Sequence, residues 1–319
     1  MPATISTAPG KTILFGEHAV VYGQPAIAIP VNERRAKVKI FPVIGVFSEK
    51  IQFIAPQIQL DKEYKELIPS HPFKIAMDEV KKYLNIPQYP SCKIFLSSTI
   101  PISSGLGSSA AISVALIKGL FEFIGFQPTK SILSQLAYQI EIEFHGHPSG
   151  IDNSVIAFNQ PILFQKKKDI ELIEPGEEFV IVIADSGIIG NTKIAVAGVR
   201  ERWLKNRIGY EAYFNKIGEL VIQAKKEIEL GNHSEVGRLM NSNQEFLQRI
   251  GVSHPSLENL IKIAIKNGAL GSKLSGGGLG GNIIALTRLE KADYLSQELL
   301  KNGAAQTIIM TLKKEIENE

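Results

Sequence analysis

A single cysteine, Cys92, occurs among the 319 residues of the sequence. One cysteine can form neither a disulfide bond within the chain nor a cysteine-based metal cluster. Blocks of basic residues are also missing. The 35 Lys and Arg residues outnumber the 32 Asp and Glu residues only slightly and are spread along the chain, so the net charge of +3 argues against nucleic acid as a partner.

Long apolar runs are equally scarce. The longest, from Ala110 to Phe126, is interrupted by Lys118 and Glu122, and no segment reaches the roughly 20 apolar residues that a membrane-spanning helix needs. The N-terminus shows no basic-then-apolar leader. With 44% hydrophobic and 21% charged residues, the composition is typical of globular proteins, and we expect a cytoplasmic protein that does not bind membranes.

The stretch Pro101–Ala111, PISSGLGSSAA, is the strongest local signal. Gly105 and Gly107 allow backbone conformations that are closed to other residues, so that several peptide N–H groups can turn toward one ligand. Ser108 and Ser109 then open a run of helix formers with regularly spaced apolar residues, and either serine can cap that helix. A glycine loop that leads into a helix N-terminus suits a phosphate group. The alternative is a tight strand-to-helix turn that binds nothing.

Two ionisable residues, Glu17 and His18, interrupt the apolar run Ile13–Tyr22. Burying a carboxylate and an imidazole costs free energy unless partners compensate for the lost water. Because Gly16 and Gly23 bracket the pair, we expect both side chains to face a ligand. The alternative is that the chain bends at Gly16 and exposes both side chains to water.

A third ionisable residue, Glu141, lies on the apolar face of a helix that the spacing predicts over 129–145. A carboxylate on that face needs a cation, a metal ion or hydrogen-bond donors, so both a salt bridge and a metal site stay open. Asp152 follows in the segment HGHPSGIDN, residues 145–153. Taken alone, an Asp-Asn pair beside glycine and serine is typical of a turn or a cap.

The chain is long enough for two domains, and the pattern becomes polar from Gln165 to Asp169. We therefore expect domains of residues 1–165 and 166–319. The apolar run Phe179–Ala184 predicts a buried strand, and four helices are expected between residues 192 and 266, with a fifth over 289–300. A second glycine-rich loop, KLSGGGLGGN at 273–282, either acts as a hinge or lets the backbone approach a ligand closely.

Four segments thus occur in order: PGKTILFGEHAVVYG, PISSGLGSSAA, HGHPSGIDN and KLSGGGLGG. Together they resemble the GHMP kinase superfamily and, through the first and third, the mevalonate kinase family within it. The resemblance implies an α+β fold of two domains, an N-terminal ribosomal-protein-like domain and a C-terminal ferredoxin-like domain, with ATP and mevalonate in the cleft between them. It also implies transfer of the ATP γ-phosphoryl group to the 5-hydroxyl of mevalonate, a step of isoprenoid precursor biosynthesis.

The resemblance also implies roles for single residues. Asp152 matches the family's catalytic base, and Lys11 matches the lysine beside it. Ser109 and Glu141 match the residues that share a Mg²⁺ ion, which accepts hard oxygen ligands of this kind. Transfer of a phosphoryl group to an alcohol needs these parts: an acceptor for the hydroxyl proton and cations that spread the charge of the transferring group.

Glu17 and His18 match residues that line the mevalonate pocket together with Lys11 and Asp152. The nucleotide site implied by the family comprises Ser98, Pro101, Ile102, Ser103, Ser104, Gly105, Leu106, Gly107, Ser108, Ser109, Ala110 and Ala111. The sequence departs from many relatives at the start of this loop, where two serines replace glycine and alanine. Leu279 also stands among the glycines of the last loop. Relatives are often dimers, so a homodimer is expected.

Other functions stay open on the sequence. A sister GHMP kinase acting on phosphomevalonate, a sugar or homoserine is the nearest, and a non-catalytic nucleotide-binding module is another. A dinucleotide-dependent oxidoreductase would fit Gly105-x-Gly107-x-x-Ala110, but residues 123–140 contain no acidic residue where that motif requires one. A P-loop ending in the GKT at 10–12 is rejected, because Ile5 stands where the motif needs glycine.

Overall fold

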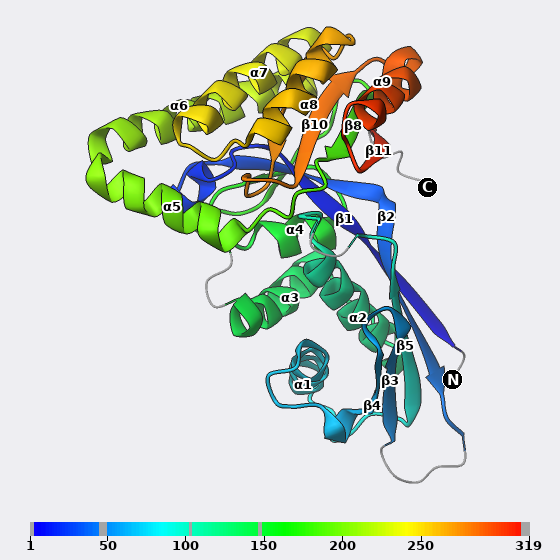
Figure 1. Ribbon diagram of the computed structural model, residues 1–319. Coiled ribbons are helices and arrows are strands. Elements are labelled where there is room, and N and C mark those ends of the chain that lie inside the picture. The colour runs from blue at the N-terminus through cyan, green and yellow to red at the C-terminus, as the bar shows by residue number, and fades with distance from the viewer. Residues whose placement is uncertain (1–2, 45–49, 102–103, 146–148, 314–319) are drawn as a thin grey trace. The chain divides into compact units, whose positions relative to one another are not determined.

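The computed structural model describes residues 3–44, 50–101, 104–145 and 149–313 of the chain (Figure 1). The chain divides into two compact units that are each built from several segments. The first unit comprises Met1–Lys11, Pro30–Ile102 and Gly107–Asn159. The second comprises Thr12–Ile29, Ser103–Leu106 and Gln160–Glu319.

Seven strands form one sheet: β1 (Thr4–Phe15), β2 (Ala26–Pro42), β3 (Ile51–Ala55), β4 (Leu60–Glu63), β5 (Cys92–Ser98), β6 (Ile162–Phe164) and β7 (Glu171–Leu172). Their order is β4-β3-β5-β2-β6-β7, with β1 also paired to β2. The pair β3–β5 is parallel, whereas β2 runs antiparallel to both β5 and β6. Strands β1 and β2 are long enough to contribute residues to both units.

Four helices complete the first unit: α1 (Pro72–Leu84), α2 (Ser108–Ile124), α3 (Lys130–His145) and α4 (Ile151–Phe158). Helix α1 buries Phe73, Ala76, Met77 and Val80, which lie three or four residues apart and so form one face of the helix. Helix α2 contacts α1, α3, α4 and strand β5, so it is buried over most of its length. Helices α2, α3 and α4 consequently form one packed group.

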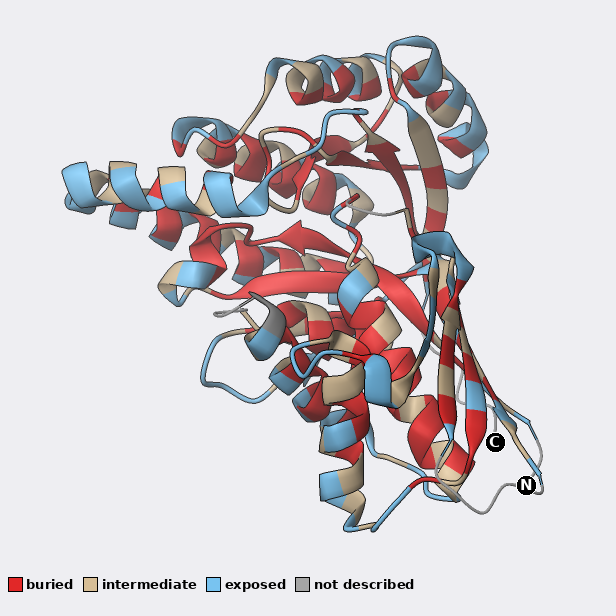
Figure 2. Cartoon of the chain, turned by 60° about the horizontal axis from the view of Figure 1, so that its bottom comes forward, coloured by how far each residue is buried: buried red, intermediate tan, exposed pale blue. Residues whose placement is uncertain are grey.

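The second unit carries a four-stranded antiparallel sheet in the order β11-β8-β10-β9. Its strands are β8 (Phe179–Asp185), β9 (Gly271–Ser275), β10 (Asn282–Thr287) and β11 (Gln306–Leu312). The helices of the unit are α5 (Thr192–Lys205), α6 (Arg207–Glu229), α7 (His233–Arg249), α8 (Pro255–Lys266) and α9 (Leu289–Lys301). Buried residues concentrate on the strands and on one face of most helices (Figure 2), as expected for sheets covered by amphipathic helices.

The structure differs from the sequence-based expectation at two strands. Pro9 and Gly10 locally favour a turn, yet β1 continues from Thr4 to Phe15, because its pairing with β2 outweighs that local signal. Strand β9 was not expected, since its sequence GSKLS is short and mostly polar. No helix among the described residues is long and apolar enough to cross a membrane.

Candidate active site

Lys11 and Asp152 form an ion pair in the first unit. Lys11 lies on β1, and Asp152 lies in the first turn of α4. The Nζ atom of Lys11 is 3.1 Å from Oδ1 of Asp152, and the lysine side chain is 8% exposed against 38% for the aspartate. The pair thus joins a buried cation to a carboxylate that solvent or a ligand can reach.

The turn expected at Asp152 is instead the start of a helix. Gly150 adopts φ +89° as the N-cap residue of α4, and the helix begins at Ile151. A residue without a side chain takes this conformation at little cost. Asp152 therefore sits at the N-terminal end of α4, where the helix dipole favours a negative charge.

Gly107 brings the first glycine loop close to Lys11. A Cβ atom on Gly107 would lie 2.7 Å from Cγ of Lys11 and 3.2 Å from Cδ1 of Ile156, and the residue has φ +74°. Space and backbone conformation therefore both require glycine at this position. The loop backbone packs directly on the aliphatic part of the lysine side chain.

The N-cap residue of α2 is also Gly107, and no side chain caps this helix end. The expectation that Ser108 or Ser109 caps the helix was wrong, because both serines already belong to its first turn. The first N–H groups of any helix lack partners within the helix. The N–H groups at the start of α2, which directly follow the glycine loop, therefore donate no hydrogen bond to a capping side chain.

Ser109 and Glu141 meet between α2 and α3. The serine hydroxyl donates to Oε1 of Glu141 at 3.0 Å, and Glu141 is 7% exposed. The carboxylate thus lies on the buried face, as predicted. Nowhere in the described ranges do three or more His, Cys, Asp or Glu side chains gather as a metal site.

The remaining residues of the predicted nucleotide site are arranged as follows. Ser104, Leu106, Ala110 and Ala111 are buried, and Gly105 has φ +75°. The backbone oxygen of Ser104 accepts from Nδ2 of Asn282, which ties the loop to β10 within the second unit. Pro101 is half-buried. Ile102 and Ser103 lie outside the described residues.

Ser98 ends strand β5, and its polar groups are engaged in local contacts. Its hydroxyl accepts from the backbone N–H of Ile100 at 3.0 Å, and its backbone pairs with the side chain of Gln57. The side chain therefore shapes the turn that leads out of β5.

Glu17 and His18 lie in the second unit and are 3% and 5% exposed. The chain does bend at Gly16, with φ +96°, but the bend turns both side chains into the protein and not into water. Glu17 forms an ion pair with Lys273 of β9, whose side chain is fully buried. The ring atom Nε2 of His18 lies 2.9 Å from the backbone oxygen of Gly277.

Burial keeps His18 neutral. It lowers the pKa of His18 from 6.5 to about 4, with a smaller opposing effect of the Gly277 hydrogen bond and a further lowering by the charge of Arg202. Because a carbonyl oxygen can only accept, the Nε2 atom must carry the proton in this contact. Nδ1 is then a hydrogen-bond acceptor at neutral pH.

The second glycine loop joins β9 to β10 across residues 276–281. Leu279, the departure noted in the sequence, adopts φ +58°, and its N–H donates to the oxygen of Val252 at 2.8 Å. The N–H of Gly281 donates to the oxygen of Ile188 at 2.7 Å. A Cβ atom on Gly278 would lie 2.2 Å from the Val252 oxygen, so the loop backbone is held against its neighbours on both sides.

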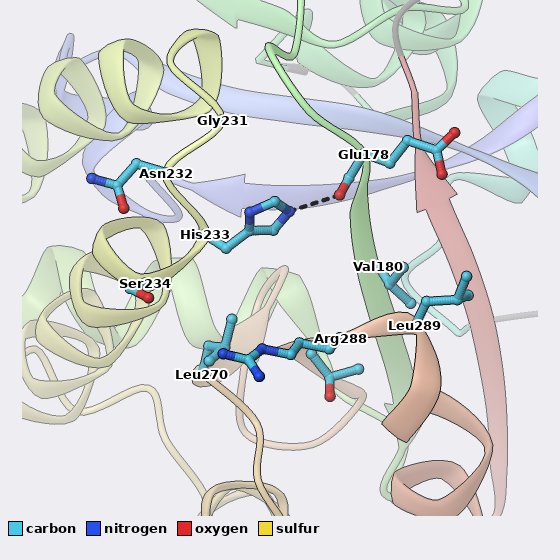
Figure 3. Close-up of a pocket in the computed structure, with 10 residues that line it drawn as sticks. Glu178, Val180, Gly231, Asn232, His233, Ser234, Leu270, Arg288 and Leu289 are labelled. Atoms are coloured by element: carbon cyan, nitrogen blue, oxygen red, sulfur yellow. Dashed lines mark hydrogen bonds between the residues drawn. The ribbon is translucent and has the colours of Figure 1, made fainter.

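A cavity of about 450 Å³ lies elsewhere in the second unit (Figure 3). Its lining includes Glu178, His233 and Arg288 but none of the predicted site residues. The imidazole of His233 contacts the backbone oxygen of Glu178 at 2.7 Å, as drawn in Figure 3. Because the paired groups described above lie outside it, this cavity is not the candidate active site.

Comparison with known proteins identifies relatives of the whole chain. The N-terminal domain family of the GHMP kinases matches residues 71–160, and their C-terminal domain family matches residues 224–305. The mevalonate kinase of Thermococcus sibiricus is 30% identical over 98% of this chain and 96% of its own length. That of Pyrococcus horikoshii is 33% identical over 88% of each chain. The chain belongs to the mevalonate kinase family of the GHMP kinases.

A solved structure of this family agrees in fold. The crystal structure of L. major mevalonate kinase in complex with R-mevalonate matches with a TM-score of 0.82 at 26% identity, over 99% of this chain and 97% of that chain. The predicted α+β fold of a two-domain GHMP kinase is thereby confirmed. The prediction of an ATP-dependent kinase is confirmed as well, and the oxidoreductase and the non-catalytic module are not favoured.

Proposed function

We propose that this member of the mevalonate kinase family transfers the γ-phosphoryl group of ATP to the 5-hydroxyl of mevalonate, giving 5-phosphomevalonate and ADP. Relatives named mevalonate kinase match over nearly the whole chain, and the structure of one of the similar enzymes contains R-mevalonate. Within the chain itself, the buried Lys11 beside the reachable carboxylate of Asp152 is the observation that carries the proposal.

Asp152 is the group that accepts or orients the proton of the substrate hydroxyl. A general base must reach the proton that it takes, and the 38% exposure of its side chain supports such access. Lys11, whose Nζ atom is 3.1 Å from the carboxylate, holds Asp152 in position. The same ammonium group favours alkoxide character at the attacking oxygen.

The first glycine loop is proposed to bind the phosphates of ATP. Positive φ angles at Gly105 and Gly107 and the uncapped start of α2 support this role, because backbone N–H groups at a helix start attract anions. The loop includes Pro101, Ile102, Ser103 and Ser104. Ser98, whose hydroxyl shapes the turn before this loop, is also proposed to lie near the nucleotide. Such N–H donors also stabilise the charge that develops on ADP during transfer.

Ser109 and Glu141 are proposed to hold a Mg²⁺ ion. Two adjacent ligands of an octahedral ion at about 2.1 Å lie about 3.0 Å apart, and the two oxygens of this pair are 3.0 Å apart. These two hard oxygen donors suit Mg²⁺, so Ser109 and Glu141 would hold the ion when it is bound. When bound, Mg²⁺ neutralises charge on the phosphates during transfer.

Glu17 and His18, like Lys11 and Asp152, are proposed to bind mevalonate. The neutral imidazole offers Nδ1 as an acceptor, which suits a hydroxyl donor of the substrate. The resemblance further supports a cytoplasmic homodimer, and light scattering of the purified protein tests the dimer.

A coupled assay of ADP release tests the function. With MgATP, we expect turnover with R-mevalonate at least a hundredfold above that with phosphomevalonate, galactose or homoserine. Comparable or faster turnover with any of the other acceptors would instead assign the chain to a sister GHMP kinase. Detection of 5-phosphomevalonate as the product excludes simple ATP hydrolysis.

A further inference from the structure

Lys273 and Glu17 form an ion pair from which solvent is excluded. Their side chains are 0% and 1% exposed, although 256 residues separate them in the sequence. The Nζ atom of Lys273 donates to Oε1 of Glu17 and, at 2.7 Å, to the backbone oxygen of Leu274. Both residues belong to the second unit.

Stability alone is a poor explanation for this pair. Burial lowers the pKa of Lys273, while the nearby carboxylate of Glu17 opposes the shift. The cost of removing two charges from water commonly cancels their attraction, so that apolar residues of the same volume would stabilise a core as well or better. The pair therefore points to a requirement for a carboxylate held at a defined place.

The neighbours of Lys273 along β9 hold the same segment of chain. The hydroxyl of Ser275 donates to the backbone oxygen of Ile13 at 2.8 Å and accepts from its N–H at 3.1 Å, and it also bonds to Thr12 at 2.7 Å. Two residues further on, the Gly277 oxygen accepts from His18. Every second residue from 273 to 277 thus bonds to the segment 12–18, through one ion pair and several hydrogen bonds.

The backbone of His18 has a conformation that requires stabilising contacts. It adopts φ +59°, a backbone conformation that costs a non-glycine residue free energy. His18 directly follows Glu17. Its position is therefore restricted from two sides, because Lys273 fixes the carboxylate of Glu17 and the Gly277 oxygen accepts a hydrogen bond from the imidazole.

We propose that Lys273 is a positioning residue for the substrate site: its ion pair with Glu17 fixes the carboxylate and the adjacent imidazole of His18 in the arrangement that binds mevalonate. This inference rests on the proposed function. Lys273 acts through Glu17 and does not itself contact the substrate.

A double-mutant cycle tests this role. Lys273→Met removes the charge at similar length, Glu17→Gln removes the partner charge, and Lys216→Met, which breaks an exposed pair with Glu219, serves as the control. We expect Lys273→Met to raise KM for mevalonate at least tenfold, with KM for ATP changed less than twofold. In the Glu17→Gln background the same substitution should change KM for mevalonate less than twofold, because its effect passes through Glu17.

A merely structural role predicts a different pattern. Lys273→Met would then lower the melting temperature and leave KM for mevalonate as in the control, and this result overturns the inference. An equally large effect of Lys273→Met in the Glu17→Gln background overturns it too, because Lys273 would then act independently of Glu17.

Two further comparisons keep the test decisive. If Lys273→Met alone fails to fold, the double variant Lys273→Met/Glu17→Gln still tests the inference, because it buries no unpaired charge. It must fold and have the same KM for mevalonate as Glu17→Gln. Failure of the wild-type chain to phosphorylate mevalonate would contradict the proposed function, whereas normal wild-type turnover with an unaffected Lys273→Met variant contradicts only this inference.

Discussion

At the scale of single residues, the neutrality of His18 makes the fold sensitive to acid. Its pKa is about 4 in the folded chain and about 6.5 when unfolded. Above pH 6.5 the residue is neutral in both states and its titration costs nothing. As the pH falls from 6.5 to 4, only the unfolded state takes up the proton, so the free energy of unfolding falls by up to about 3 kcal/mol.

Urea unfolding of the wild type and of His18→Gln between pH 4 and 7 measures this effect. Glutamine can still donate to the Gly277 oxygen but does not titrate. We expect the wild type to lose stability relative to the variant as the pH drops, with the difference growing below pH 6.5. Parallel curves for the two proteins would show that His18 is not the group responsible.

Asp152 offers a second test at this scale. Asp152→Asn keeps the size of the side chain but removes the proton acceptor, so we expect kcat to fall by about 10²–10⁴ while ATP binding stays within a few-fold of the wild type. Single-turnover kinetics and titration with a nucleotide analogue separate the two quantities. Asp169→Asn in an exposed segment is the control, and a kcat near that of the control would remove Asp152 from its role.

At the scale of elements, the contact between α2 and α3 predicts a metal dependence. Glu141→Gln keeps the shape of the side chain but weakens an oxygen ligand of Mg²⁺, so the concentration of Mg²⁺ for half-maximal rate should rise at least tenfold. Glu143→Gln changes an exposed carboxylate on the same helix and should leave that concentration unchanged. Equal titration curves for the two variants would return Glu141 to a structural role.

Two glycine-to-alanine variants, one at each end of α2, separate the effect of Gly107 on activity from its effect on stability. Gly107 and Gly125 both adopt positive φ, but only Gly107 has Lys11 within reach of an added Cβ atom. Each change to alanine should destabilise the fold by about 1–2 kcal/mol. Only Gly107→Ala should also displace Lys11 and lower kcat, by at least tenfold. If both variants lose the same activity, the close approach to Lys11 is unimportant.

Elements that depend on local pattern were predictable from the sequence. Helix α1 follows its apolar spacing, and strand β8 its apolar run. Strand β9 was missed, because its pairing with β10 is tertiary information that GSKLS does not carry. The same limit applies to the site. The carboxylate on the buried stripe of α3 indicated Glu141, but no local feature of Lys273 pointed to a partner 256 residues away.

At the scale of the whole molecule, the second unit is not a continuous piece of chain. It includes Thr12–Ile29. In this segment Glu17 pairs with Lys273, and the ring of Tyr22 stacks on that of Phe214 with 4.1 Å between the ring centroids. The sequence predicted domains of residues 1–165 and 166–319, and that boundary stays a prediction. A fragment of residues 166–319 would lack the partner of a fully buried lysine.

We therefore expect the fragment 166–319 alone to unfold without a cooperative transition and to bind a hydrophobic dye, because an uncompensated buried cation and an uncovered aromatic face are both unfavourable. The matched control is the full chain cleaved at a protease site placed in the exposed segment 166–168, which keeps both pieces. It should unfold cooperatively, near the temperature of the intact chain. Cooperative unfolding of the isolated fragment, measured by calorimetry, would show that residues 166–319 form a self-sufficient domain and that residues 12–29 are dispensable for it.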